Sequence, residues 1–161
     1  PHTTNWDFPL MLALTKVSGV RASWLGKRSL FKGPMGPIMR WLGGVAVDRS
    51  APGGMVHSLV GELTSRDRLA LLVPAEGTRA HTPYWKSGFY RIALEANVPV
   101  VCGFVDSVTR TGGLGSIVTL IGDVARDMDV IRAFYDGKKG VKAANTGAIR
   151  LRDEDPPDAA E

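Results

Sequence analysis

The segment RLALLVPAEGTR, residues 68–79, joins an apolar run to a polar turn. Its first part predicts a strand over residues 69–73, because a short apolar run bounded by polar residues is typical of a strand buried within a sheet. Ligands of open α/β sheets bind beyond the carboxyl ends of the strands, so the turn after this strand is a candidate binding site. The turn contains Glu76, Gly77, Thr78 and Arg79.

A similar pattern occurs earlier, in GVAVDRS at residues 44–50. The apolar residues 45–47 predict a buried strand that places Asp48 and Arg49 at its carboxyl end. A guanidinium presents a fork of donors that matches phosphate oxygens, which makes Arg49 a candidate phosphate contact. The alternative is that Asp48 and Arg49 form an ion pair at the end of the strand, without a ligand.

Predicted helices and strands alternate along most of the chain. We predict helices over residues 6–17, 37–42, 55–63 and 86–96, and strands over residues 20–26, 45–47, 69–73 and 97–105. This alternation is typical of an α/β domain with a mostly parallel central sheet and helices on both faces. Further along we expect another strand over residues 116–124 and a helix over residues 127–137.

The predicted helix that follows the EGTR turn begins with Lys86, Ser87 and Gly88. The first N–H groups of a helix have no partner within the helix, and they favour an anion at this end. Lys86 and the turn residues are therefore expected to face the same region and to bind an anionic ligand together.

Length and composition predict a single domain. The chain has 161 residues, of which 44% are hydrophobic, and this is enough to fill one core. We expect the domain to occupy residues 1–137 and to be followed by a polar, flexible tail over residues 138–161. Because the chain begins at Pro1, directly before the first motif, we also expect the first strand of the domain to lie upstream of residue 1.

Charge and cysteine content narrow the choice of function. The net charge of +4 favours an anionic partner such as a phosphate-bearing ligand or an acidic lipid surface. We expect no nucleic-acid partner, because the chain lacks the sequence signatures of the common nucleic-acid-binding folds. The single cysteine, Cys102, excludes an internal disulfide and a cysteine-based zinc site, and its apolar neighbours indicate a buried thiol. The motifs of α/β-hydrolases and P-loop proteins are absent.

The first seven residues, PHTTNWD, place His2 and Asp7 in an H-x-x-x-x-D spacing. A histidine can accept a proton from an alcohol at neutral pH, and a carboxylate bonded to its other ring nitrogen fixes its tautomer. Such a pair can activate the hydroxyl of a substrate without a protein nucleophile. The alternative is a surface histidine next to an acidic residue at the start of a helix.

The stretch from Lys27 to Trp41 interleaves basic residues with large apolar ones. Such a mixture is typical of a segment that lies on an anionic membrane surface. A packed helix with solvated lysines explains the same pattern, and the sequence leaves both interpretations open.

Four blocks in this order resemble the glycerolipid acyltransferase family. The blocks are HTTNWD, GGVAVDR, EGTR with the following WKSG, and VPVV, and the similarity spans residues 1–105. The resemblance implies transfer of an acyl group from a thioester, either acyl-CoA or an acyl carrier protein, to a hydroxyl group. It implies no metal and no bound cofactor, because the thioester donor is itself a substrate.

The resemblance also implies roles for individual residues. His2 matches the general base and Asp7 its orienting partner. The substrate-binding residues that match are Arg49, Glu76, Gly77, Thr78, Arg79 and Lys86. We expect His2, Arg49 and Arg79 to converge near the carboxyl ends of the strands, because one acceptor molecule must reach both the base and the phosphate-binding arginines.

The expected acceptor is a phosphate-bearing glycerolipid such as lysophosphatidic acid. Relatives with the same blocks acylate other lipid-like alcohols, including glycolipids, so these acceptors remain alternatives. A non-catalytic module that binds phosphate or lipid is a further alternative, and it would not need His2. We expect a cytoplasmic location with peripheral contact to the anionic inner face of the plasma membrane.

Overall fold

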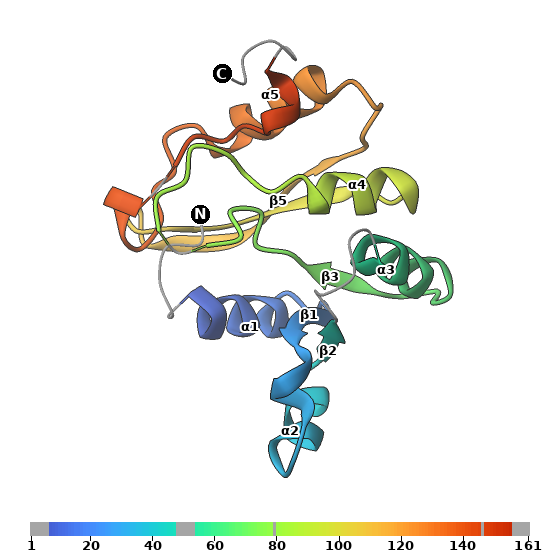
Figure 1. Cartoon of the computed structure of the whole chain (residues 1–161). Helices are drawn as coiled ribbons and strands as arrows, with labels where there is room; N and C mark the ends of the chain where they lie inside the picture. The colour runs from blue at the N-terminus through green and yellow to red at the C-terminus, as the bar shows by residue number, and fades with distance from the viewer. Residues whose placement is uncertain (1–6, 48–53, 79, 146, 156–161) are drawn as a thin grey trace.

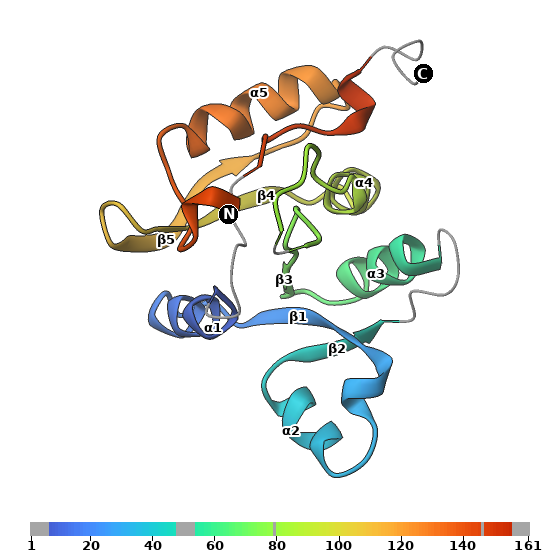
Figure 2. The ribbon, with the colours of Figure 1, turned by 60° about the vertical axis from the view of Figure 1, so that its left-hand side comes forward.

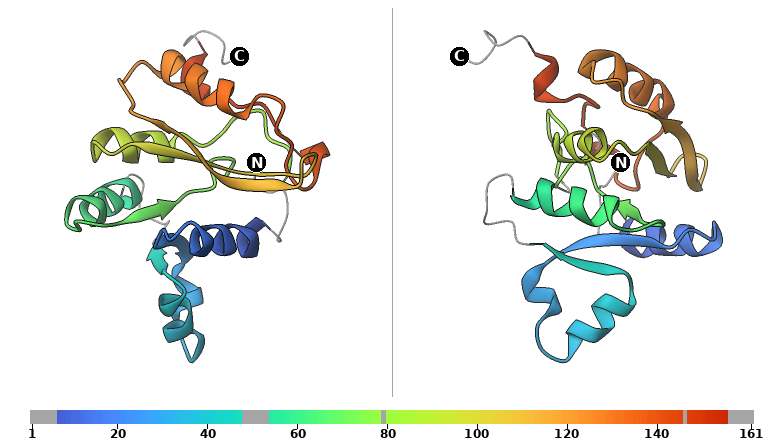
Figure 3. Two further views of the ribbon diagram at one scale, coloured as in Figure 1. Left: turned by 180° about the vertical axis from the view of Figure 1, so that it is seen from behind. Right: turned by 90° about the vertical axis from the view of Figure 1, so that its right-hand side faces the viewer.

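The structure is a computed structural model, and it describes residues 7–47, 54–78, 80–145 and 147–155. The described elements form two layers, one above the other in Figure 1 and Figure 3. The first layer is built on β1 (Ala22–Lys27), β2 (Gly44–Val47) and β3 (Ala70–Leu72). The second layer is built on β4 (Val100–Asp106), β5 (Thr111–Val118) and α5 (Val124–Tyr135).

Within the described residues, the first layer is a parallel sheet with the strand order β2-β1-β3. Trp24 of β1 lies opposite Gly44 on one side and Leu72 on the other. Parallel neighbours require crossover connections, which here are helical. The crossovers are η1 (Arg28–Phe31) with α2 (Met35–Trp41), and α3 (Gly54–Thr64). Figure 2 shows α2 and α3 on opposite sides of the strands, and the predicted α/β class is confirmed.

The first crossover packs tightly because two strand glycines leave room for one aromatic ring. Phe31 is only 6% exposed, and its ring lies against Gly26 and Gly44. A Cβ at Gly44 would lie 2.8 Å from the Phe31 ring and 2.7 Å from the carbonyl oxygen of Met39. Even an alanine at Gly44 would therefore force the crossover away from the sheet.

The second crossover forms a small core with α4 (Gly88–Glu95). Leu59 of α3 and Ile92 of α4 are buried against each other, and Leu25 and Leu71 of the sheet pack around them. This contact fixes α4 beside α3, as Figure 1 shows. Lys86, which lies two residues before α4, is thereby held close to the sheet of the first layer.

The second layer has its own core between α5 and the antiparallel pair. Its fully buried side chains include Met128 and Ile131 of α5, and Cys102 of β4 is 2% exposed. Burial raises the pKa of the Cys102 thiol, in agreement with the prediction of a buried cysteine.

The pairing of β4 differs from the sequence-based prediction. Residues 97–105 were expected to join the parallel sheet, but β4 pairs antiparallel with β5, from Val100 opposite Val118 to Asp106 opposite Thr111. Only four residues, 107–110, connect the two strands, and so short a loop permits only an antiparallel pair. The strand expected over residues 116–124 accordingly lies earlier in the chain, over 111–118.

Helix α1 (Asp7–Val17) lies against the second layer as well as the first. Met11 and Leu14 approach two glycines of the antiparallel pair, Gly103 and Gly112. A Cβ at Gly112 would lie 3.1 Å from the Leu14 side chain. The absence of side chains at these positions allows α1 to approach the pair closely.

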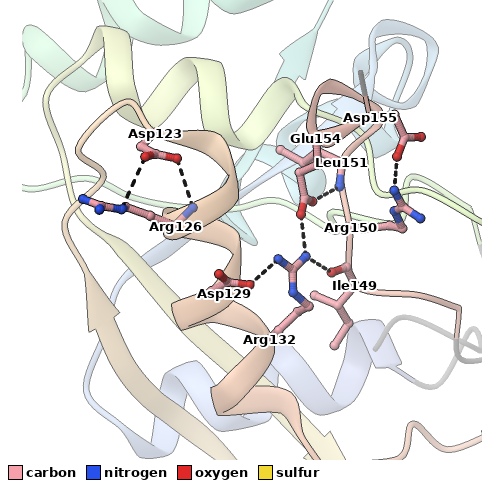
Figure 4. Close-up of polar contacts among 9 residues, drawn as sticks. All are labelled: Asp123, Arg126, Asp129, Arg132, Ile149, Arg150, Leu151, Glu154 and Asp155. Atoms are coloured by element: carbon pink, nitrogen blue, oxygen red, sulfur yellow. Dashed lines mark hydrogen bonds and ion pairs between the residues drawn. The ribbon is translucent and has the colours of Figure 1, made fainter. Parts of the chain in front are cut away.

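The predicted flexible tail is wrong for the described residues up to Asp155. Leu151 is fully buried in the core of the second layer, and Ile149 packs against this core. As Figure 4 shows, Arg132 of α5 donates to the carbonyl oxygen of Ile149 at 3.0 Å and to the Glu154 carboxylate at 2.7 Å. Two apolar residues and a partly buried ion pair thus attach this segment to α5.

Candidate functional site

The structure describes half of the predicted site. Glu76, Gly77, Thr78 and Lys86 are described, and Asp7 is the first residue of α1. The residues outside the described part are His2, Arg49 and Arg79, together with the side chain of Asp7. The convergence of the base with the two arginines therefore stays a prediction.

The turn after β3 has a defined geometry. The N–H of Gly77 donates to the carbonyl oxygen of Pro74 at 3.1 Å, and Gly77 has a φ of +65°. A residue with a side chain is strained at this φ, so the glycine is required by the turn. Next to it, the Thr78 hydroxyl accepts a hydrogen bond from the N–H of Ala80 at 3.2 Å. The turn predicted after this strand is present, and Gly77 adopts the left-handed conformation within it.

Lys86 lies across this turn. Its N–H donates to the carbonyl oxygen of Ala75 at 2.7 Å, which ties the start of α4 to the turn. Its aliphatic stem occupies the space beside Gly77, because a Cβ at Gly77 would lie 2.8 Å from the Lys86 Cγ. The Lys86 side chain as a whole is exposed. The turn and the lysine, ten residues apart in the chain, therefore form one surface with a cation at its edge.

Glu76 points into the protein, unlike its neighbours in the turn. It is only 8% exposed, and its charge acts on the hydroxyl of Tyr135 in α5. Burial, together with the charges of Cys102 and Glu76, raises the pKa of Tyr135. The Tyr135 hydroxyl itself donates to the carbonyl oxygen of Gly103 at 2.8 Å. The buried Glu76 side chain thus anchors the turn on the protein side, towards Tyr135.

Two aromatic residues that the sequence analysis missed support the same loop. Trp85 is buried and packs edge-to-face on Tyr135, with the ring centroids 5.7 Å apart. The backbone N–H of Trp85 donates to the carbonyl oxygen of Arg150 at 2.8 Å, so the C-terminal segment also holds the loop between β3 and α4 in place. The spacing of Met128, Ile131 and Tyr135 along one helix face was the available signal that Tyr135 is part of the core.

A pocket of about 410 Å³ lies at a different place, next to the carboxyl ends of β1 and β2. We call it the cationic pocket, and it is lined by Arg28, Phe31, Lys32, Arg40, Ala46 and Ser58. Among the described residues that line it, three are basic and none is acidic. The three cations belong to the stretch from Lys27 to Trp41, for which the sequence leaves open both membrane contact and a packed helix with solvated lysines, and its spacing does not indicate a shared pocket.

The described residues were searched for a metal-binding cluster and for a membrane-spanning helix. No cluster of three or more histidine, cysteine or acidic side chains able to hold a metal ion is found in the described part of the chain. Nor does any helix within that part have the length and apolar composition needed to cross a bilayer.

A family model matches most of the chain. A model of the family described as "Acyltransferase" matches residues 1–104, which is well over half of the chain and includes all four sequence blocks. No curated protein and no solved structure matched at the level required for significance. The chain therefore belongs to the acyltransferase family, the family of glycerolipid acyltransferases that its sequence blocks resemble.

Proposed function

We propose that this acyltransferase moves a fatty acyl group from acyl-CoA or an acyl carrier protein to a hydroxyl of a phosphate-bearing glycerolipid such as lysophosphatidic acid. The observation that best supports this acceptor is the placement of Lys86 across the turn that contains Gly77 and Thr78. A lysine next to exposed backbone and hydroxyl groups, at the carboxyl end of a parallel strand, suits a phosphate group.

In the proposed reaction His2 acts as the general base and Asp7 orients its ring. His2 takes the proton of the acceptor hydroxyl while the hydroxyl oxygen attacks the thioester carbonyl carbon. The tetrahedral intermediate then collapses, the carbon–sulfur bond breaks, and the thiol leaves with the proton that His2 had taken. The products are the ester and the free thiol of the carrier. Because the thioester donor is already activated, the proposal includes no cofactor.

The acceptor phosphate would be held by Arg49, Arg79 and Lys86, with the Thr78 hydroxyl as a further donor. Glu76 has a different role in this proposal. Its carboxylate is buried, and it would repel a phosphate, so it orients the turn and does not touch the ligand.

We further propose peripheral attachment to the anionic cytoplasmic face of the plasma membrane. Four large apolar side chains of η1 and α2 are exposed: Leu30 by 48%, Met35 by 51%, Ile38 by 48% and Trp41 by 84%. They alternate with basic residues, a combination that favours the boundary between lipid headgroups and acyl chains. Vesicle binding should weaken with salt and with the removal of Trp41.

The function is tested by measuring acyl transfer from a panel of acyl-CoAs and acyl carrier proteins to several lysolipids, with products read by mass spectrometry on the full-length protein. His2→Ala should lower kcat by roughly 10²–10⁴-fold, the usual loss for a missing general base. His57→Ala is the matched control, because His57 is an exposed histidine on α3. Arg79→Ala should mainly raise the KM for the acceptor.

Two results would reject this proposal. Near-normal kcat in His2→Ala would show that His2 is not the general base. A burst of acyl-enzyme in the absence of acceptor would show a covalent intermediate, which direct attack by the acceptor hydroxyl excludes.

A further inference from the structure

The cationic pocket joins side chains from three successive parts of one crossover. Arg28 lies in η1, Lys32 directly follows η1, and Arg40 lies in the last turn of α2. The Arg40 guanidinium carbon lies 6.0 Å from the centroid of the Phe31 ring, which helps to fix its orientation. Ser58 of α3 adds a hydroxyl to the lining. The fold thus brings three cations and a hydrogen-bonding group together around one space.

The segment that supplies the three cations is strongly basic. Residues 8–47 contain six basic residues and no acidic one. Among the described residues, neither Lys32 nor Arg40 forms an ion pair, and Glu62 of α3 is paired with Arg66 at 2.6 Å. Like charges held close together repel one another, so an anion that enters the pocket relieves this repulsion.

The surroundings of the pocket indicate where its anion comes from. The exposed residues Leu30, Met35 and Ile38 belong to the same crossover as the three cations. A water-soluble anion would gain nothing from these apolar side chains. A membrane lipid would gain from both, because its headgroup could enter the pocket while the apolar side chains contact the acyl chains.

We infer that the cationic pocket binds the phosphate group of an anionic phospholipid, which fixes the protein on the bilayer in one orientation. The volume of about 410 Å³ lies within the range of small-molecule sites and accommodates a phosphate with part of its headgroup. This inference rests on the proposed membrane attachment and adds to it a site that recognises phosphate specifically.

The inference also explains why the pocket lies where it does. Lys27 and Val47 end β1 and β2 in register, and the pocket begins directly beyond Lys27. A lipid headgroup in the pocket would hold the bilayer surface near the carboxyl ends of the strands. The proposed acceptor is itself a lipid, and it would then approach those strand ends from the membrane.

The test compares two kinds of anionic vesicle at equal surface potential. One contains phosphatidic acid, and the other contains cholesteryl hemisuccinate, whose charge is a carboxylate. We expect the protein to bind phosphatidic acid vesicles at least about tenfold more tightly, since a phosphate monoester presents three oxygens and a charge of about −1.5 to −2 to the cations, whereas a carboxylate presents two oxygens and a single charge. The double variant Lys32→Gln and Arg40→Gln should lose this preference and keep the weaker binding to both vesicles.

The matched control is the double variant Lys16→Gln and Arg21→Gln. It removes the same charge from exposed positions of the same 8–47 segment outside the pocket. It should keep the preference for phosphatidic acid, and its general binding should fall by a similar factor for both vesicles. Equal binding of the unmodified protein to the two vesicles overturns the phosphate site. Loss of the preference in both double variants overturns it as well, because the effect is then one of total charge.

A third arm separates the lipid from a soluble phosphate. Glycerol 3-phosphate, titrated without vesicles and followed by calorimetry, should show no binding that depends on Lys32 and Arg40. If it does, the pocket is a site for soluble phosphates and the lipid assignment is rejected. Acyl transfer to a short-chain, water-soluble lysolipid should continue in the pocket double variant, so a failure of the proposed reaction is recognised separately.

Discussion

Residues 8–47 of the first layer contain six basic and no acidic residues, whereas arginines of the second layer lie in ion pairs. Arg132 contacts Asp129 at 2.6 Å and Glu154 at 2.7 Å, and Arg150 contacts Asp155 (Figure 4). The whole chain has 20 basic and 16 acidic residues, so fourteen basic and all sixteen acidic residues lie outside 8–47. The net positive charge of the protein thus arises from residues 8–47, because acidic residues outnumber basic ones in the rest of the chain.

The difference separates two uses of the same side chain. In the second layer, arginines hold the C-terminal segment on α5, and this segment in turn supports the loop that contains Trp85. In the first layer, residues 8–47 contain no acidic partner of their own, and Lys32 and Arg40 form no ion pair with any described residue, so these two cations are suited to an external anion. Changes in the second layer should therefore alter stability, and changes in the first layer should alter ligand binding.

The largest effect on stability is expected for Leu151→Ala. Leu151 has no exposed surface, and its truncation leaves a cavity in the core shared by α5 and Trp85. The free energy of unfolding should fall by about 2–5 kcal/mol, the usual cost of a buried Leu→Ala change. Chemical denaturation of the two proteins gives this difference directly.

The matched control is Leu30→Ala in the first layer. Leu30 is 48% exposed, so its truncation should change the free energy of unfolding by less than about 0.5 kcal/mol while weakening vesicle binding. A similar loss of stability in both variants would mean that the two layers do not differ in the way described.

Elements whose signal is local could be predicted from the sequence. The helices expected over 6–17 and 55–63 correspond to Asp7–Val17 and Gly54–Thr64, and the strand over 45–47 corresponds to Gly44–Val47. Apolar periodicity and helix-ending glycines are contained within each segment, so no distant contact is needed to recognise them.

Features that depend on distant partners could not be predicted. The strand Thr111–Val118 begins with three glycines in its first five residues, a composition that disfavours strands. Gly115 is nevertheless required, because the Phe134 ring occupies the position of any side chain there. Likewise Leu151 is an isolated apolar residue in a polar segment, and only its contact with the core around Trp85 reveals its role.

The candidate site was predicted in part for the same reason. The turn residues and Lys86 follow from strand ends and a helix start, which are local signals. The buried orientation of Glu76 depends on Tyr135, nearly sixty residues further along the chain. The cationic pocket depends on Ser58 from the next helix, which no spacing within residues 27–41 could indicate.

The next prediction compares two glycines with the same backbone conformation. Gly77 has a φ of +65° beside Lys86, and Gly137 has a φ of +72° with nothing near its Cβ position. Each Gly→Ala change should cost about 1–2 kcal/mol of stability from the left-handed backbone alone. Only Gly77→Ala should also displace the Lys86 stem and raise the KM for the acceptor. Equal acceptor KM values in the two variants would remove Lys86 and the turn from the proposed binding site.

A direct test of the charge comparison replaces one arginine in each layer. Arg132→Gln removes the contacts to the Ile149 carbonyl oxygen and to the Glu154 carboxylate. The Glu154 side chain is only 10% exposed. The free energy of unfolding should fall by about 1–2 kcal/mol, because a partly buried carboxylate loses its partner. Arg40→Gln should change stability by less than about 0.5 kcal/mol. If Arg40→Gln destabilises as much as Arg132→Gln, the first-layer cations are structural and the comparison fails.

The smallest effect concerns pH, and it arises from Asp106 at the end of β4. The Asp106 carboxylate accepts from the Thr109 hydroxyl at 2.6 Å and from the N–H of Lys139 at 3.1 Å, and these bonds lower its pKa to about 2. The unfolded-state pKa of an aspartate is about 3.9, so the folded state binds the proton less tightly. The stabilisation is therefore fully present above about pH 5 and is lost as the pH falls through about 4 towards 2.

Asp106→Asn should remove this contribution, because an amide does not titrate. The stability gap between the unmodified protein and Asp106→Asn should narrow steadily as chemical denaturation is repeated from about pH 6 down to about pH 2.5. Residues 8–47 contain no acidic group, so this segment adds nothing to the acid dependence. A gap that stays constant over this range would mean that the Thr109 and Lys139 bonds do not favour the charged form of Asp106, and the acid sensitivity would then have to come from other carboxylates of the protein.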